Sequence, residues 1–167
     1  MKKVLLFILL LAPMAVMAQK FGHVNTQDII QAMPDYTKAK NEIDALQKQY
    51  EADLKSMQDE LTKKSQDYEA NEKTFPENIK QRRQQELQDM YQKIQQSYQD
   101  NQQALQKAQQ EKLGAIQEKV MAAVKKLGES GQYVYIVDIS TGAIPFVSTT
   151  LSTDITDQLK KEVGIAQ

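Results

Sequence analysis

The sequence is poor in the residues from which reactive sites are built. Its 167 residues include no cysteine, no tryptophan and a single histidine, His23. Without cysteine, disulfide bonds and thiolate chemistry are excluded, so stability has to come from packing alone. One histidine and no cysteine give no convincing zinc site or Ser-His-Asp set, and the chain has no Gly-rich phosphate loop and no HExxH or GxSxG motif. The sequence therefore predicts a protein that is not an enzyme and that holds no metal or cofactor.

The chain also lacks an excess of charge of either sign. It contains 21 basic and 22 acidic residues. A nucleic-acid-binding protein would need a strong basic excess, so no nucleic-acid partner is expected. The isolated candidates for chemistry have ordinary structural interpretations: His23 lies in a predicted strand, Asp138 in another strand, and Asp154 at a predicted helix start.

The first 18 residues have the pattern of a secretion signal. Lys2 and Lys3 form a positive start, residues 4–11 an apolar run, and residues 16–18 a small-residue cleavage site. We expect cleavage after Ala18 and export. An uncleaved anchor is the alternative, but the apolar run is shorter than the roughly 20 residues that span a bilayer. The remaining chain, with 19 basic and 22 acidic residues and a net charge of −3, is expected to be soluble beyond the inner membrane.

Residues 36–127 predict two long helices folded back on each other near residues 74–77. Apolar residues recur along the first helix in steps of three and four, which is typical of one narrow apolar stripe. The second helix matches it at equal distances from the fold, so that the numbers of each facing pair add up to about 151 or 152. The pairs are Leu61 with Met90 and Tyr91, Met57 with Ile94, Leu54 with Tyr98, Leu46 with Leu105, Ile43 with Ala108, and Tyr36 with Ile116. Two antiparallel helices in one register require such a constant sum.

The ends of these helices carry their own signals. Thr74 and Glu77 predict a capping box with Pro76 in the first turn, and Gly128 predicts a helix end after Leu127. At 1.5 Å per residue the two helices, of 38 and 51 residues, would be about 57 and 76 Å long. A compact domain of the remaining 149 residues would have a radius of gyration of only about 15 Å. The helices must therefore project as an arm.

The rest of the chain predicts a small β-rich body made of residues 19–35 and 128–167. The expected elements are strands near residues 20–25, 133–139 and 143–148, the last one an edge strand with Pro145, a short helix capped by Asn25, and a final helix over residues 155–163. A body of 57 residues has little core of its own, so a core shared between subunits is expected. The candidate oligomerisation residues in the clearest strand are Tyr133, Tyr135, Ile136 and Val137.

Glutamine dominates the second helix, with thirteen of the thirty residues 81–110. These glutamines are either a solvated helix face or an adaptable polar lining that grips no ligand tightly. Lys80, Arg82 and Arg83 form a basic cluster near the fold, but acidic neighbours on the same helix explain it at least as well as anion binding does.

The order of these features resembles the Skp (OmpH-like) family of periplasmic chaperones. The matching parts are the signal, the opening residues 21–25, residues 32–36 at the entry to the arm, the hairpin, residues 135–138 and the closing residues 154–157, which together cover essentially the whole mature chain. The resemblance implies an α+β fold, a homotrimer whose β elements form a central body, and hairpin arms that hold unfolded outer-membrane proteins without ATP. Membrane contact would be indirect or transient.

The resemblance has one departure, because residues 60–90 carry six basic and seven acidic groups whereas better-known relatives have strongly basic arms. We therefore assign no lipopolysaccharide-binding residues to this chain from the resemblance. Aromatic surface on the arm is the candidate for client contact instead, supplied by Tyr68, Phe75, Tyr91 and Tyr98. The alternative function is a structural or adaptor coiled-coil protein of the cell envelope that docks one folded partner.

Overall fold

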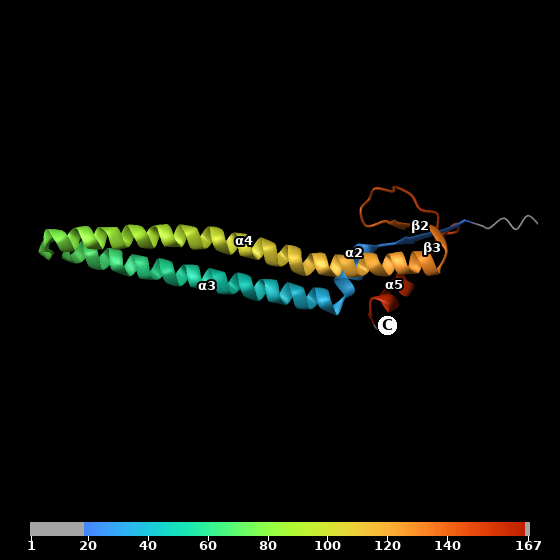
Figure 1. Ribbon diagram of the computed structural model, residues 1–167, viewed down its shortest axis with the longest axis horizontal. Coiled ribbons are helices and arrows are strands. Elements are labelled where there is room, and N and C mark those ends of the chain that lie inside the picture. The colour runs from blue at the N-terminus through green and yellow to red at the C-terminus, as the bar shows by residue number, and fades with distance from the viewer. Residues whose placement is uncertain (1–18, 166–167) are drawn as a thin grey trace, which may run out of the picture.

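The structure, a computed structural model, describes residues 19–165, so the predicted signal over residues 1–18 lies outside the described part. Long helices dominate the described chain, and three short strands accompany them (Figure 1). The elements are β1 (Lys20–Val24), α2 (Thr26–Ala32), α3 (Pro34–Asn71), the short 3-10 helix η1 (Glu72–Thr74), α4 (Glu77–Ser130), β2 (Tyr133–Asp138), β3 (Ser152–Asp154) and α5 (Thr156–Glu162).

The helices α3 and α4 lie side by side and are antiparallel: α3 leads away from the remaining elements to the fold, and α4 leads back to them (Figure 1). With 38 and 54 residues they are about 57 and 81 Å long. Ion pairs join them at intervals along their length. Lys119 pairs with Asp35 at 2.7 Å and Lys112 with Glu42 at 2.5 Å, and a Lys64–Glu86 pair lies nearer the fold. These pairs are consistent with the predicted register.

The chemistry of the fold-back differs from the predicted capping box. The hydroxyl of Thr74 donates a hydrogen bond to the carbonyl of Asn71 at 2.7 Å, so it serves the end of the first helix rather than the start of the second. Pro76 itself occupies the N-cap of α4, without a side-chain cap, and Glu77 is the first helical residue. The predicted capping box does not form because residues 72–74 belong to η1, which continues the first helix in a tighter winding.

The end of α4 lies three residues beyond the predicted one. The helix continues through Gly128 to Ser130, and Gly131 is its C-cap, with its N–H donating to the carbonyl of Leu127 at 2.9 Å. Gln132 then adopts a left-handed conformation with φ of 54°, which turns the chain into β2. Gly128 lies inside the helix, and a Cβ added there would lie 3.4 Å from the side chain of Ile136 in β2, which is an ordinary packing distance.

The three strands form one parallel sheet in the order β2-β1-β3. Parallel strands need a crossover connection, and the chain between β1 and β2 that forms it includes the whole arm. The predicted strand over residues 143–148 is wrong: this segment is irregular, and the third strand is β3. Pro145 cannot donate to a ladder, whereas residues 152–154 lie beside the free edge of β1, where Gly22 pairs with Thr153.

The hydrophobic core lies where α2, α5 and the base of the arm cover one face of the sheet. Its most completely buried residues are Val24, Ile29, Met33, Val120, Ile155 and Leu159, none more than 1% exposed. Three of these residues lie in helices and one, Val24, lies in a strand, so helices contribute more to this core than strands do. Two local predictions are confirmed: the side chain of Asn25 caps α2 by accepting from the N–H of Asp28 at 3.2 Å, and Pro34 is the first residue of α3.

Candidate functional site

One face of the sheet carries uncovered aromatic rings. Along β1, Gly22 and Val24 are buried against the core, whereas Phe21 and His23 lie on the other side. The ring of Phe21 stacks on that of Tyr135, with centroids 6.3 Å apart and planes inclined by 12°. Tyr135 remains 67% exposed. An exposed stacked pair of this kind is typical of a surface that meets another macromolecule.

The four predicted oligomerisation residues do not share one face. Ile136 and Tyr133 pack against the core of their own chain, and the ammonium group of Lys20 lies 4.2 Å from the Tyr133 ring centroid. The Tyr133 hydroxyl is buried without a hydrogen-bond partner among the described residues. Val137 is half-buried, so Tyr135 is the exposed residue among these four. Because a bulge between residues 20 and 21 shifts the register, simple alternation along β2 mispredicts these orientations.

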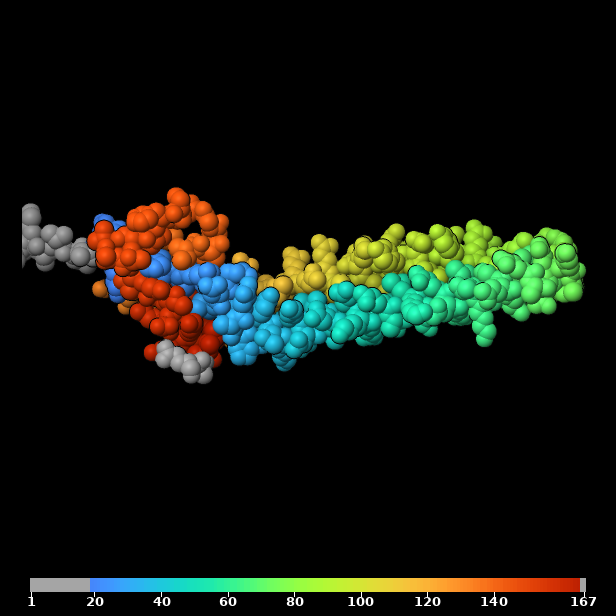
Figure 2. All heavy atoms as spheres, turned by 180° about the vertical axis from the view of Figure 1, so that it is seen from behind, coloured from blue at the N-terminus to red at the C-terminus, as the bar shows by residue number. Residues whose placement is uncertain are grey.

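The loop between β2 and β3 carries exposed apolar residues that the sequence reasoning missed as a site. Phe146 is 79% and Leu151 81% exposed, and Ile144 is also exposed. The loop stands out from the body in the space-filling view (Figure 2). The signal was present in the sequence as an apolar run around Pro145, but it was assigned to a strand. With Tyr135, these residues form what we call the apolar body surface.

The four predicted client-binding aromatics divide into two pairs. Tyr68 and Phe75 are half-buried at the tip and contact each other, with ring centroids 6.3 Å apart. The Tyr68 hydroxyl accepts a hydrogen bond from Gln84 at 2.8 Å, and burial together with the negative charge of Glu72 raises the pKa of Tyr68. Tyr91 and Tyr98 are more than half exposed on α4 and remain available for contact.

One member of the basic cluster near the tip, Arg83, takes part in an ion pair. Arg83 contacts Glu86 at 3.1 Å, and Lys64 from the opposite helix bonds to the same carboxylate. The hydrogen bond from Lys64 is the main cause that lowers the pKa of Glu86, and the same bond raises the pKa of Lys64. This arrangement favours pairing within the arm over anion binding by Arg83.

Asp138 and Asp154 have the structural roles that were predicted. Burial alone raises the pKa of Asp138, but hydrogen bonds from Thr26, at 2.5 Å to its hydroxyl, and from Ser140 outweigh burial and lower it. The side chain of Asp154 accepts from the hydroxyl and N–H of Thr156 at the start of α5, which lowers the pKa of Asp154. His23 contacts the hydroxyl of Ser152 at 2.9 Å.

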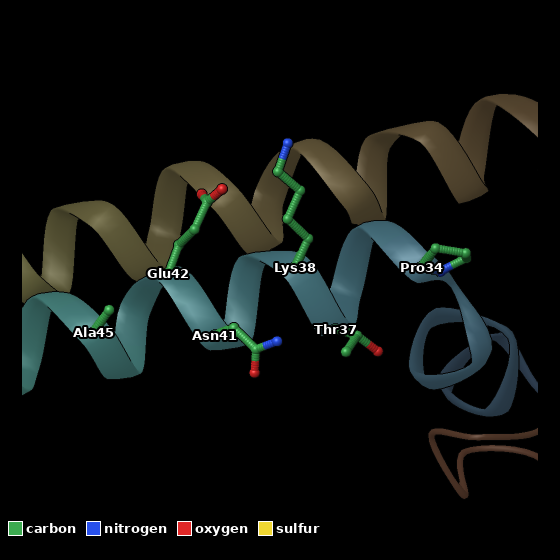
Figure 3. Close-up of a pocket in the computed structure, with 6 residues that line it drawn as sticks. All are labelled: Pro34, Thr37, Lys38, Asn41, Glu42 and Ala45. Atoms are coloured by element: carbon green, nitrogen blue, oxygen red, sulfur yellow. The ribbon is translucent and has the colours of Figure 1, made fainter.

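The part of the chain that the structure describes offers no group of three His, Cys, Asp or Glu residues that could hold a metal ion. The surface hollow beside the start of α3, about 610 Å³ in volume, is lined by that helix alone. Lys38 and Glu42 extend toward α4, whereas Thr37 and Asn41 point away from it (Figure 3). Its polar groups therefore do not converge on a common point. Over residues 19–165, no helix combines the length and the apolar character needed to cross a membrane.

Comparisons with known proteins agree with this architecture. The sequence profile of the outer membrane protein (OmpH-like) family matches residues 20–163. Among solved structures, a candidate OmpH-like outer membrane chaperone from Caulobacter crescentus aligns with a TM-score of 0.75 over 87% of this chain and 83% of that chain, at 13% sequence identity. At this identity the likeness concerns the fold alone. No curated protein matches the chain.

The family match extends over both parts of the molecule. It begins at β1, runs through the whole of α3 and α4, and ends just after α5. Because the match spans far more than half of the sequence, it applies to the arm and the body together. The chain belongs to the OmpH-like outer membrane protein family.

Proposed function

We propose that this protein is a periplasmic, ATP-independent holdase chaperone that encloses unfolded outer-membrane proteins between projecting arms and prevents their aggregation. Family membership and the chaperone fold of the Caulobacter crescentus protein support a chaperone role. A secretion signal over residues 1–18 would deliver the chain to the periplasm, with cleavage after Ala18. Contact with membranes would then be indirect or transient.

The observation that carries the proposal is the length of the arm, whose helices of 38 and 54 residues extend far beyond the hydrophobic core at their base. Most of its surface is polar and solvated, yet Tyr91 and Tyr98 are 57% and 51% exposed on it. Scattered apolar contacts among glutamines suit an unfolded chain, because many weak contacts bind through their number and release without an energy source. The balanced charge of residues 60–90 favours such contacts over simple charge attraction.

A homotrimer would place three arms around one space. The apolar body surface supports self-association, because Phe146, Leu151 and Tyr135 are too exposed for an isolated soluble domain. The outer edge of β2 is also free in the described chain, and free strand edges are usually covered. In this proposal residues 19–35 and 128–167 form the association body and residues 36–127 the arm.

The competing function is an envelope adaptor that docks one folded partner. To separate the two, several unrelated outer-membrane barrels are diluted from urea with and without the mature protein, and their aggregation is followed by light scattering. A holdase suppresses the aggregation of all of them without ATP. An adaptor protects none, or binds a single folded partner at a fixed ratio, and either result would overturn the proposal.

A further inference from the structure

We propose that a groove on one flank of the arm binds apolar side chains of an extended, unfolded polypeptide. The inference rests on the proposed function and deepens it by naming the surface and the chemistry of contact. The groove lies between α3 and α4 and has a volume of about 310 Å³. Tyr50 and Leu54 of α3 and Tyr98 and Leu105 of α4 supply its apolar lining, and we call it the Tyr98 groove.

The groove exists because two helices alone cannot cover their own seam. Leu54, Tyr50 and Leu105 are only half-buried, although they belong to the apolar stripe that joins the helices. Tyr98 borders them and is 51% exposed. A volume of about 310 Å³ lies at the small end of the range for ligand sites. It therefore suits individual side chains of a flexible chain better than the surface of a folded partner.

The polar groups around the groove are nearly all neutral. Gln102 donates to the Tyr98 hydroxyl at 2.7 Å, and Gln47 donates to Glu51, the one charged residue of the lining, at 2.8 Å. Amides can donate to or accept from peptide groups in either direction, which tolerates many sequences. No basic residue lines the groove, so an anionic headgroup would find no cation there.

A second hollow farther along the seam has a different character. Met57 and Ile94 contribute apolar atoms there, but charged residues surround them. These charged residues are Glu60, Lys64, Glu86 and Lys93. An apolar side chain entering that hollow would desolvate these charges, including the pairs that Lys64 makes with Glu60 and Glu86. The chemistry of the seam therefore favours the Tyr98 groove as the place where an uncharged client segment is held.

Tyr91 offers a matched comparison for the test. It lies seven residues before Tyr98, hence on nearly the same face of α4, and it is exposed to a similar extent, but it does not line the groove. The probe is a fluorescent, unfolded peptide with alternating Phe and Ser residues and no charge. Its affinity for the mature protein is measured by fluorescence anisotropy. Tyr98→Ser is expected to weaken binding about tenfold, whereas Tyr91→Ser weakens it about twofold.

Two further measurements test whether the effect of Tyr98→Ser is direct. Tyr98→Phe keeps the ring and should bind nearly as the parent does, while a photoreactive residue replacing Gln102 should cross-link to the peptide and one replacing Lys93 should not. Equal losses for Tyr91→Ser and Tyr98→Ser would overturn the groove and leave the holdase intact. Cross-linking from position 102 only to a second copy of the chain would identify an arm–arm contact and also overturn the groove. If the parent protein neither binds the peptide nor prevents aggregation, the proposed function itself fails.

Discussion

Two glycines of the α4 region, Gly114 and Gly131, have opposite surroundings. A Cβ added to Gly131 would lie 2.5 Å from the ring of Tyr133 and 2.8 Å from the carbonyl oxygen of Leu127. A Cβ on Gly114, in the middle of the helix, would meet no atom within 4 Å. The close approach of Tyr133 thus requires glycine at one position, whereas the other glycine only weakens the helix.

This contrast gives a matched pair of stability predictions. Gly131→Ala should lower the free energy of unfolding by about 1 to 3 kcal/mol through overpacking. Gly114→Ala should raise the free energy of unfolding by about 0.5 to 1 kcal/mol, because alanine restricts the unfolded chain and favours the helix. Urea titrations followed by circular dichroism measure both. Equal changes in the same direction would show that the surroundings of the two glycines are misassigned.

The carboxyls of Asp138 and Asp154 predict loss of stability in acid. Both have a folded-state pKa below the ordinary value of 3.8, because hydroxyl and backbone N–H groups donate to them. Such groups contribute stability that is fully present above the unfolded-state pKa and is lost as the pH falls through the folded-state pKa. The free energy of unfolding should therefore stay level above about pH 5 and decrease below about pH 4.

The control for this pH dependence is Asp138→Asn, which removes one titrating group while keeping an acceptor oxygen near Thr26. Its free energy of unfolding, measured by urea titration at each pH, should decrease less steeply than that of the parent below about pH 4. An identical slope in the two proteins would mean that the hydrogen bonds of Asp138 do not affect its pKa in solution.

At the scale of elements, the register of the arm can be tested directly. Met57 and Ile94 line the same hollow from opposite helices. Cysteines at these two positions should cross-link readily, and the chain has no other cysteine to interfere. Cysteines at Met57 and Asn101 should not cross-link, because seven residues displace the second one by about 10 Å along the helix. Non-reducing electrophoresis compares the two, and preference for the second pair would contradict the register.

Local pattern was sufficient to predict the long helices and most of the short elements. Steps of three and four residues between apolar positions persist through α3, and Asn25 and Pro34 mark helix starts by chemistry that acts within a few residues. The third strand was mispredicted because residues 143–148 look more like a strand than residues 152–154 do. Its position is decided by pairing with β1, which lies about 130 residues earlier in the sequence.

The candidate site was predictable to a smaller extent for the same reason. The exposure of Tyr91 and Tyr98 follows from their place at the border of a two-helix seam. The contact between Tyr68 and Phe75 depends on how the chain winds at the fold, and the inward packing of Ile136 depends on a bulge in the sheet. Neither can be read from residue spacing, because each arises from contacts between separate segments.

For the whole molecule, the apolar body surface predicts how copies assemble. Tyr135→Asp combined with Phe146→Asp should dissociate the proposed trimer to monomers, because both side chains are exposed in the single chain and would be buried between copies. Helix content should not change, since neither residue contacts the core. Thr149→Asp, in the same exposed loop, is the control and should remain trimeric. Light scattering measures the mass, and a double variant that stays trimeric would exclude this surface as the interface.

The central claim is that three arms together enclose one unfolded client, and the mass of the complex tests it most directly. An eight-stranded outer-membrane barrel is diluted from urea into an excess of the mature protein, and the soluble complex is weighed by native mass spectrometry without ATP. The account predicts three copies of this chain with one client molecule. A complex of one chain with one client, or no soluble complex at all, would contradict it.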